Sequence, residues 1–241
     1  MAGRAWEGGN EPAGAMGPAY LARSGRAAMD VMMLSMDVAL SFFGTAVVLA
    51  LVPGPDNLCV LAQSATAGWR AGMRLVLGLC SGLVVHTAAV ALGLAVVFQA
   101  STLAFIILKL CGAAYLLYLA WQAFAHAKDV GGVGQGVGLA GWALYRRGIL
   151  MNISNPKVSL FFLAFLPQFV TPGQGSVTGQ LISLGALFML AALLVFGAIA
   201  LLAGRLGDLL RRSPEVQIWM NRGAGVVFVA LALKLAFSGR D

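Results

Sequence analysis

The stretch Leu51-Val-Pro-Gly-Pro-Asp-Asn-Leu58 interrupts a long apolar run. Its prolines, Pro53 and Pro55, each remove a backbone donor and disturb a helix, and an ionised Asp56 is costly in hydrocarbon. Non-helical backbone persists at membrane depth where it is buried in protein or lines a cavity. A second interruption, Asn152-Ile-Ser-Asn-Pro-Lys157, lies in a later apolar run. We therefore expect the function of the protein to lie between these two breaks.

The composition predicts a protein that lies in the lipid bilayer. Hydrophobic residues make up 60% of the chain, charged residues 10%, and the mean hydropathy is +0.87. A soluble domain is about 45–50% apolar and about 25% charged, and several apolar runs here reach the roughly 20 residues that span a bilayer. The net charge of +7 does not indicate nucleic-acid binding, because most basic residues stand between apolar runs, where they set membrane orientation.

The apolar runs predict an all-α, polytopic fold of six transmembrane helices, with prolines breaking helices one and four. The expected spans are residues 38–62, 75–98, 103–124, 148–170, 181–203 and 219–237. Gly112 in span three and Gly225 in span six each open a similar stretch that ends in a phenylalanine, Phe124 and Phe237. Together with the breaks in matching spans, this predicts a 3+3 inverted repeat, the pattern of secondary transporters.

Residues 1–36 differ from the rest of the chain. Gly, Ala and Pro are common there, and charges of both signs are scattered, which predicts a disordered N-terminal tail. No uninterrupted apolar core follows Arg4, so the tail is not interpreted as a signal peptide. Our hypothesis is that translation starts at Met33 or Met36 and that the tail is an artefact of start-codon choice. The transporter domain is then residues 37–241.

The distribution of basic residues predicts the orientation of the spans. The connections between spans two and three and between spans four and five carry no Lys or Arg. The other three connections carry Arg70, Arg74, Lys128, Arg146, Arg147, Arg205, Arg211 and Arg212. The positive-inside rule places the basic connections in the cytoplasm and both termini outside.

Four stretches together resemble the LysE/RhtB family of amino-acid exporters. They are Pro53-Gly-Pro-Asp-Asn57, Gly112-Ala-Ala-Tyr-Leu-Leu-Tyr-Leu-Ala-Trp121, Gly148-Ile-Leu-Met-Asn-Ile-Ser-Asn-Pro-Lys157 and Phe161-Phe-Leu-Ala-Phe-Leu-Pro-Gln-Phe169. The resemblance runs from about residue 36 to the C-terminus. It implies efflux of amino acids or related metabolites across the bacterial inner membrane, driven by the proton gradient and without a cofactor. It does not choose between basic and neutral amino acids.

Asp56 is the acidic residue placed well inside a span. It could carry protons, for which burial would have to favour its neutral form, or it could bind the ammonium of an amino acid. The alternative is that it caps the helix after the proline break. Asn57 could hold a carboxylate or a freed backbone carbonyl. Pro53, Gly54 and Pro55 are expected to shape the cavity.

Lys157 stands near mid-membrane in the second break. It could pair with Asp56 or receive a substrate carboxylate, and the alternative is a lysine that snorkels to the interface. Asn152, Asn155 and Pro156 complete this break, with Pro156 shaping the cavity.

His86 in span two could relay protons near neutral pH, although a lone histidine on an apolar helix is more often packed and hydrogen-bonded. The small residues of spans two and three permit a homo-oligomer.

Other function classes have weaker support. A transporter of a different small metabolite or of a metal cation is the main alternative, but intramembrane Asp, Glu, His and Cys do not cluster as a metal site requires. No GxSxG, HExxH or carboxylate pair is present, so an enzyme is not expected. Cys59, Cys80 and Cys111 lack CxxC spacing and are interpreted as small packing residues.

Overall fold

The computed structural model describes residues 34–100, 102–128, 138, 141–171 and 173–237. The predicted tail, residues 1–36, lies almost entirely outside these ranges. The structure therefore does not test the hypothesis about the start codon. The first described helix begins at Met36, and the Ser35 hydroxyl caps it by accepting from the Val38 amide at 3.4 Å.

The regular structure of the described residues is helical throughout. Its elements are α2 (Met36–Leu51), α3 (Pro55–Ala67), α4 (Trp69–Ala100), α5 (Thr102–Ala125), α6 (Trp142–Ile153), α7 (Pro156–Leu160), the π-helix η1 (Phe161–Phe165), the 3-10 helix η2 (Leu166–Phe169), α8 (Val177–Arg212) and α9 (Pro214–Phe237). Within the described ranges, α4, α5, α8 and α9 are each long and apolar enough to cross a membrane. Counting each of two bent pairs as one span raises the number to six. The predicted all-α, polytopic membrane fold is confirmed.

Both bends fall at the predicted breaks. The axes of α2 and α3 differ by 63°, and α6 meets the α7–η2 segment at 50°. Pro55 is the first residue of α3 and Pro156 the first of α7, because a proline at the first helical position needs no amide donor and has a suitable φ angle. The prolines therefore start new helices rather than kinking old ones.

The basic connections are shorter than predicted. Only Gly68, at φ +83°, separates α3 from α4, so Arg70 lies in the first turn of α4 rather than in a loop. Arg146 and Arg147 likewise lie inside α6, which begins at Trp142, and α8 continues through its three arginines to residue 212. A helix can continue past the hydrocarbon because arginine stems extend their charged ends to water.

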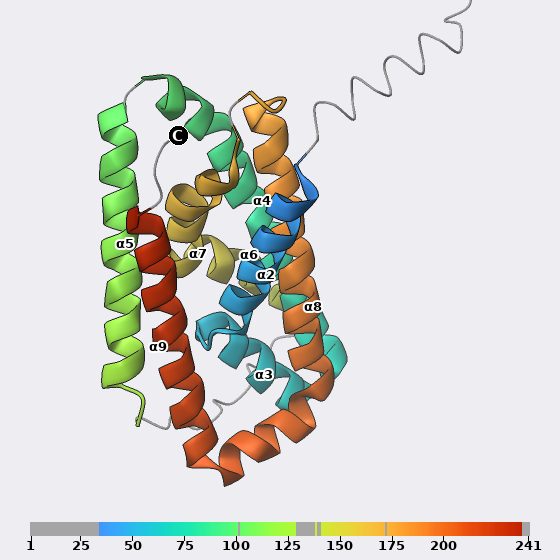
Figure 1. Ribbon diagram of the computed structural model, residues 1–241. Coiled ribbons are helices and arrows are strands. Elements are labelled where there is room, and N and C mark those ends of the chain that lie inside the picture. Colours follow the sequence, from blue (N-terminus) through green and yellow to red (C-terminus); the bar gives the residue numbers. More distant parts are fainter. Residues whose placement is uncertain (1–33, 101, 129–137, 139–140, 172, 238–241) are drawn as a thin grey trace, which may run out of the picture.

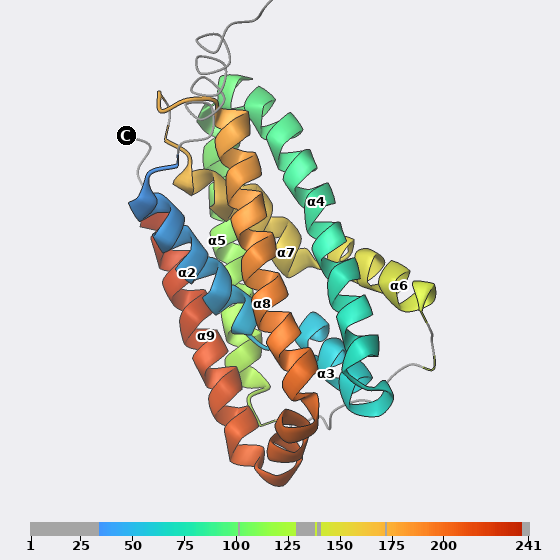
Figure 2. The same ribbon diagram turned by 90° about the vertical axis from the view of Figure 1, so that its right-hand side faces the viewer.

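The helices form one bundle with two chemically different ends. In Figure 1, the start of α2, the junction of α4 with α5 and the connection from η2 to α8 lie at one end. The α3–α4 turn, the end of α5 and the α8–α9 turn lie at the other, which is the end with the basic segments. Helix α5 packs on α9, while α8 packs on α2, α3 and α4 (Figures 1 and 2).

Glycines bring α4 and α6 into backbone contact. A Cβ on Gly78 would overlap the Tyr145 carbonyl oxygen, and one on Gly148 would overlap the Leu75 carbonyl oxygen. A Cβ on Gly82 would lie 2.7 Å from the side chain of Asn152. The glycine pair Gly78 and Gly82 on α4 therefore faces α6 and sets the position of the second break.

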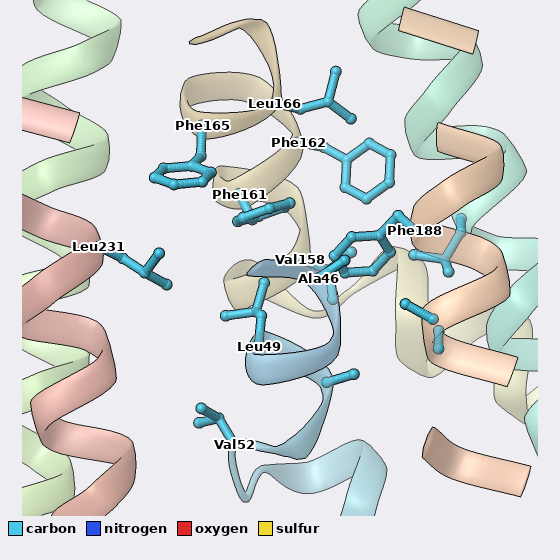
Figure 3. Close-up of a cluster of buried hydrophobic side chains, with 14 of the residues drawn as sticks. Ala46, Leu49, Val52, Val158, Phe161, Phe162, Phe165, Leu166, Phe188 and Leu231 are labelled. Carbon is cyan, nitrogen blue, oxygen red and sulfur yellow. The ribbon is translucent and has the colours of Figure 1, made fainter. Parts of the chain in front are cut away.

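A cluster of phenylalanines fills the bundle beyond the breaks. Its members, called the phenylalanine cluster below, are Phe42, Phe161, Phe162, Phe165, Phe169 and Phe188. Figure 3 shows several of them above the end of α2, marked by Val52. Three come from η1, whose π geometry the sequence analysis did not anticipate. Pro167 cannot donate to the carbonyl four residues earlier, so the helix departs from α geometry just before it.

Candidate functional site

The two helix breaks meet at the centre of the bundle. Asn155 Nδ2 donates to Asp56 Oδ2 at 2.8 Å, across 99 residues of sequence. Both side chains are buried, with 3% of Asp56 and 7% of Asn155 exposed. A neutral donor on a buried carboxylate is a charge-assisted hydrogen bond, stronger than one between neutral groups. The structure thus brings together two residues that the sequence analysis placed in the site.

Asp56 does not cap its own helix. The N-cap of α3 is Gly54, and no side chain completes that cap. Asp56 lies in the first turn of α3, where the helix dipole favours a negative charge. Its Oδ1 atom is buried and has no hydrogen-bond partner among the described residues. The carboxylate therefore retains one acceptor atom for another donor.

Lys157 reaches across to the first break. Its Nζ donates to the Val52 carbonyl at 3.3 Å, a carbonyl that the end of α2 leaves without a helical donor. Gly54 allows this approach, because a Cβ there would lie 3.2 Å from Nζ. The Lys157 side chain is half-buried. Within the described structure it holds the broken backbone rather than forming an ion pair with Asp56.

Asparagine side chains bond to other backbone groups at the breaks. Asn57 Nδ2 donates to the Ala50 carbonyl at 2.7 Å, which is the backbone-repair alternative considered for this residue. Asn155 Oδ1 caps α7 by accepting from the Lys157 amide at 3.0 Å. Asn152 is 1% exposed, and its Oδ1 has no hydrogen-bond partner in the part of the chain described.

His86 packs beside the second break. Its Nε2 lies 3.1 Å from the Asn152 carbonyl oxygen, and its ring centroid is 5.6 Å from that of Phe162. Nε2 therefore carries the proton of the neutral ring, since a carbonyl can only accept. This is the packed, hydrogen-bonded arrangement, and a role in proton relay stays a prediction.

Two cavities open at the breaks. The first, called the α6 cavity, has a volume of about 640 Å³ and is lined by Pro55, Asp56, Trp142, Ala143, Arg146, Arg147, Leu150, Met151, Ser154, Asn155 and Pro156. The second, called the α5–α9 cavity, has a volume of about 530 Å³. It is lined by Pro53, Gly54, Pro55, Tyr115, Leu119, Gln122, Ala123, His126, Asn155, Pro156, Lys157, Asn221, Ala224 and Phe228. The four residues expected to shape the cavity, Pro53, Gly54, Pro55 and Pro156, all line one or both.

Several lining residues were missed from sequence. Arg146 was assigned to a loop, yet Trp142, Arg146 and Leu150 follow each other at four-residue intervals on α6, and the C-cap Ser154 continues this stripe. A similar pattern holds for α5: Tyr115, Leu119 and Gln122 share one face of this helix, and His126, just after its end, continues that face. Polar members of such a stripe within an apolar run are the signal that could have identified this wall.

The described residues offer no ready metal site. No group of three or more His, Cys, Asp or Glu side chains lies close enough to hold a metal ion within those ranges. The three cysteines are free thiols. The metal-cation alternative therefore has no ligand set in the described part of the chain.

Fold and site together define a polytopic membrane protein with a polar site between two broken spans. The chain belongs to the LysE type translocator family, which matches residues 47–239 and is a family of transporters. It is 33% identical over 195 residues to the homoserine/homoserine lactone efflux protein of Salmonella typhimurium, covering 80% of this chain and 92% of that one.

Relatives named only as uncharacterized membrane proteins match a similar share of the chain. An uncharacterized membrane protein of Vibrio cholerae serotype O1 is 31% identical over 203 residues, which are 84% of this chain and 98% of that protein. The membrane protein YrhP of Bacillus subtilis is 28% identical over 212 residues, covering 84% of this chain and all of the relative. No solved structure matches the chain significantly.

Proposed function

We propose that this chain exports amino acids, or small molecules closely related to them, across the bacterial inner membrane in exchange for protons. The family and the named efflux relative support a transporter of this kind. The observation that carries the proposal is the Asp56–Asn155 contact, which stands where the α6 cavity and the α5–α9 cavity share their lining.

The charges at this junction fit an amino acid. Asp56 Oδ1 is free of protein donors in the described structure and belongs to a residue that lines the α6 cavity. Lys157 lines the α5–α9 cavity, and Pro55, Asn155 and Pro156 border both. An ammonium group bound at Asp56 would leave the carboxylate of the same substrate directed toward Lys157. An amino acid and its lactone share the ammonium, so Asp56 would serve either.

The two cavities and the phenylalanine cluster suggest an inward-facing state. The α5–α9 cavity lies against the last part of α5 and the first half of α9, near the basic end of the bundle. The phenylalanine cluster lies on the opposite side of the breaks (Figure 3). If the basic end faces the cytoplasm, substrate enters from inside and is released outside when the cluster separates.

Proton coupling follows from competition at one carboxylate. Asp56 cannot hold a proton and form an ion pair with a substrate ammonium at the same time. Protonation therefore releases the substrate, and loss of the proton restores the binding site. Because each ligand favours a different state, a proton gradient can drive substrate in the opposite direction.

An inverted repeat would give this motion its symmetry. The two bends occupy matching spans, and contacts between α5 and α9 are reciprocal. A Cβ on Gly112 would lie 3.2 Å from Leu235 Cδ2, and one on Gly225 would lie 2.6 Å from the ring of Phe124. Two halves related in this way can rock about a fixed site at their interface.

Export from loaded cells tests the proposal. Cells with and without the protein are loaded with dipeptides, and the released amino acids are measured outside, with and without a protonophore. We expect selective export of one class of amino acid that stops when the gradient collapses and when Asp56 is changed to Asn. Asp37→Asn, which alters an exposed carboxylate in α2, should export normally. The proposal would be contradicted if protein shown to be in the membrane exported no amino acid in a gradient-dependent manner.

A further inference from the structure

A third cavity lies behind Asp56. Its volume is about 20 Å³, and its polar lining comes from Asp56, Asn152 and Lys157. Apolar walls include Leu49 and Ala192. A void of roughly 10–15 Å³ by such a measure is enough for one water molecule. This space, called the small cavity below, therefore suits a single water and is too small for an amino acid.

The side chains around the small cavity require a particular ligand chemistry. Asp56 Oδ1 and Asn152 Oδ1 are both acceptors, both are buried, and neither has a hydrogen-bond partner among the residues described. The Lys157 side chain, a donor, lines the same space. A matching ligand has two donors and an acceptor, as water does. A metal cation could meet the two oxygens, but the neighbouring ammonium would repel it.

Asp56 separates the small cavity from the α6 cavity, because it lines both. Phe188 lines the small cavity and belongs to the phenylalanine cluster. The small cavity is thus the side of Asp56 that faces the cluster, while the α6 cavity is the side that receives the substrate. The carboxyl group of Asp56 therefore borders the small cavity on one side and the α6 cavity on the other.

We propose that the small cavity binds one water molecule, which donates to Asp56 and Asn152 and passes protons to Asp56 from the side of the phenylalanine cluster. When the cluster separates, this water transfers the proton of its hydrogen bond to Asp56 Oδ1 while it takes up another from a hydronium ion among the waters on the cluster side, so the water in the small cavity stays neutral. Asp56 later releases that proton into the α6 cavity. The inference rests on the proposed proton exchange, and it gives substrate and proton separate routes to one carboxylate.

Variants that fill the small cavity test its role in proton transfer without changing the residues that bind the substrate. Ala192→Val places two methyl groups in the wall of the cavity, whereas Ala191→Val makes the same change at an equally buried neighbour that does not line it. Purified variants in liposomes are assayed for substrate exchange without a gradient and for uptake driven by an imposed proton gradient. We expect Ala192→Val to lose about tenfold in driven transport, the scale of one buried hydrogen bond, and to keep its exchange rate. Ala191→Val should resemble the parent in both assays.

Infrared spectroscopy tests the water directly. In acid-minus-neutral difference spectra of the parent, we expect an O–H band that shifts when H₂¹⁶O is replaced by H₂¹⁸O, and that Ala192→Val removes while Ala191→Val does not. If Ala192→Val fails to fold, Ala50→Val, which fills the same cavity from α2, replaces it. A parent without the isotope-sensitive band, or full driven transport in a cavity-filled variant, would overturn the inference. A parent that neither exchanges nor exports any substrate would instead refute the proposed function.

Discussion

The two helix breaks differ in how their backbone groups are satisfied. At the second break, Asn155 caps α7 with its own side chain, and the amides of Ser154 and Asn155 donate to carbonyls of α6 at 3.0 Å each. At the first break, the N-cap of α3 is Gly54, which has no side chain to complete the cap, and the Val52 carbonyl accepts from Lys157, which belongs to α7. The second break supplies the cap of its own helix, whereas the first break, although Asn57 donates to Ala50 within it, takes the donor to Val52 from the second. Damage should therefore spread from the second break to the first more than in the reverse direction.

The largest effect is expected for Asn155→Ala. This change removes the α7 cap, worth about 0.5–2 kcal/mol, and the hydrogen bond to a buried carboxylate, worth about 1.5–3 kcal/mol. We expect a loss of roughly 2–4 kcal/mol in the free energy of unfolding and no measurable transport. Denaturant unfolding in detergent measures the first. Asn221→Ala is the control, since the side chain of Asn221 makes one long hydrogen bond among the described residues, at 3.4 Å to the Ala127 carbonyl. An Asn155→Ala protein as stable as the control would show that the second break does not rely on its own cap.

Lys157→Met should rank next. It leaves the Val52 carbonyl without a donor at the first break, which costs about 1–3 kcal/mol, although the altered residue lies in the second. Cysteines placed on either side of each break would report the damage through their rates of alkylation. We expect faster labelling around Val52 and unchanged labelling around Ser154. Lys128→Met, at an exposed lysine, is the control. An equal increase in labelling rate at both breaks would contradict the conclusion that the first break depends on a donor from the second.

Asp56→Asn should change stability little and coupling greatly. An asparagine oxygen can still accept from Asn155, so the contact survives as a weaker, neutral hydrogen bond. The substitution also removes the attraction of the charge to Lys157 and its interaction with the α3 dipole, the latter worth about 0.3–1 kcal/mol. Uphill transport should nevertheless stop, because the amide neither takes up a proton nor pairs with an ammonium. Melting temperature and gradient-driven transport, measured on the same preparation, separate the two effects. A large fall in melting temperature would indicate a structural role for the charge.

Gly54→Ala should have the smallest effect on stability. The φ angle of Gly54 is −166°, which alanine adopts without strain, so the free energy of unfolding should change by less than about 1 kcal/mol. Its Cβ would nevertheless lie 3.2 Å from Lys157 Nζ and weaken the bond to Val52. We expect slower transport than in Gly44→Ala, where a Cβ meets nothing within 4 Å. Equal rates in the two variants would show that the position of Lys157 is not critical.

The sequence was sufficient to place the breaks and to nominate the residues that meet there. Proline chemistry and the cost of a carboxylate in hydrocarbon are local arguments, so Pro55, Asp56, Asn155 and Lys157 could be selected without a structure. Their partners could not be predicted. Nothing in the spacing of residues indicates that Lys157 donates to Val52, because that contact depends on how two distant segments cross.

Helix boundaries and local geometry were also beyond the sequence. Arg146 was assigned to a connection because charge usually marks the end of a span, yet it lines a cavity from within α6. Lys234 lies in the last turn of α9, where a lysine commonly extends its charged end toward the membrane interface. Its Nζ instead lies 4.5 Å from the ring centroid of Phe169 and 5.8 Å from that of Phe165. In both cases, the tertiary environment gives a charge a position that hydropathy alone does not reveal.

The glycine contacts between α4 and α6 have a consequence for how motion in this protein can be measured. Because Gly78 and Gly148 bring the two backbones together without intervening side chains, the pair has nothing to repack and should move as one rigid body. The distance between His86 on α4 and Asn152 on α6 should then stay constant through a transport cycle and can serve as a reference distance. The distance between Asp56 and Asn155 should change during the cycle. Comparing this distance with the His86–Asn152 distance would show which half of the molecule stays fixed while the other moves.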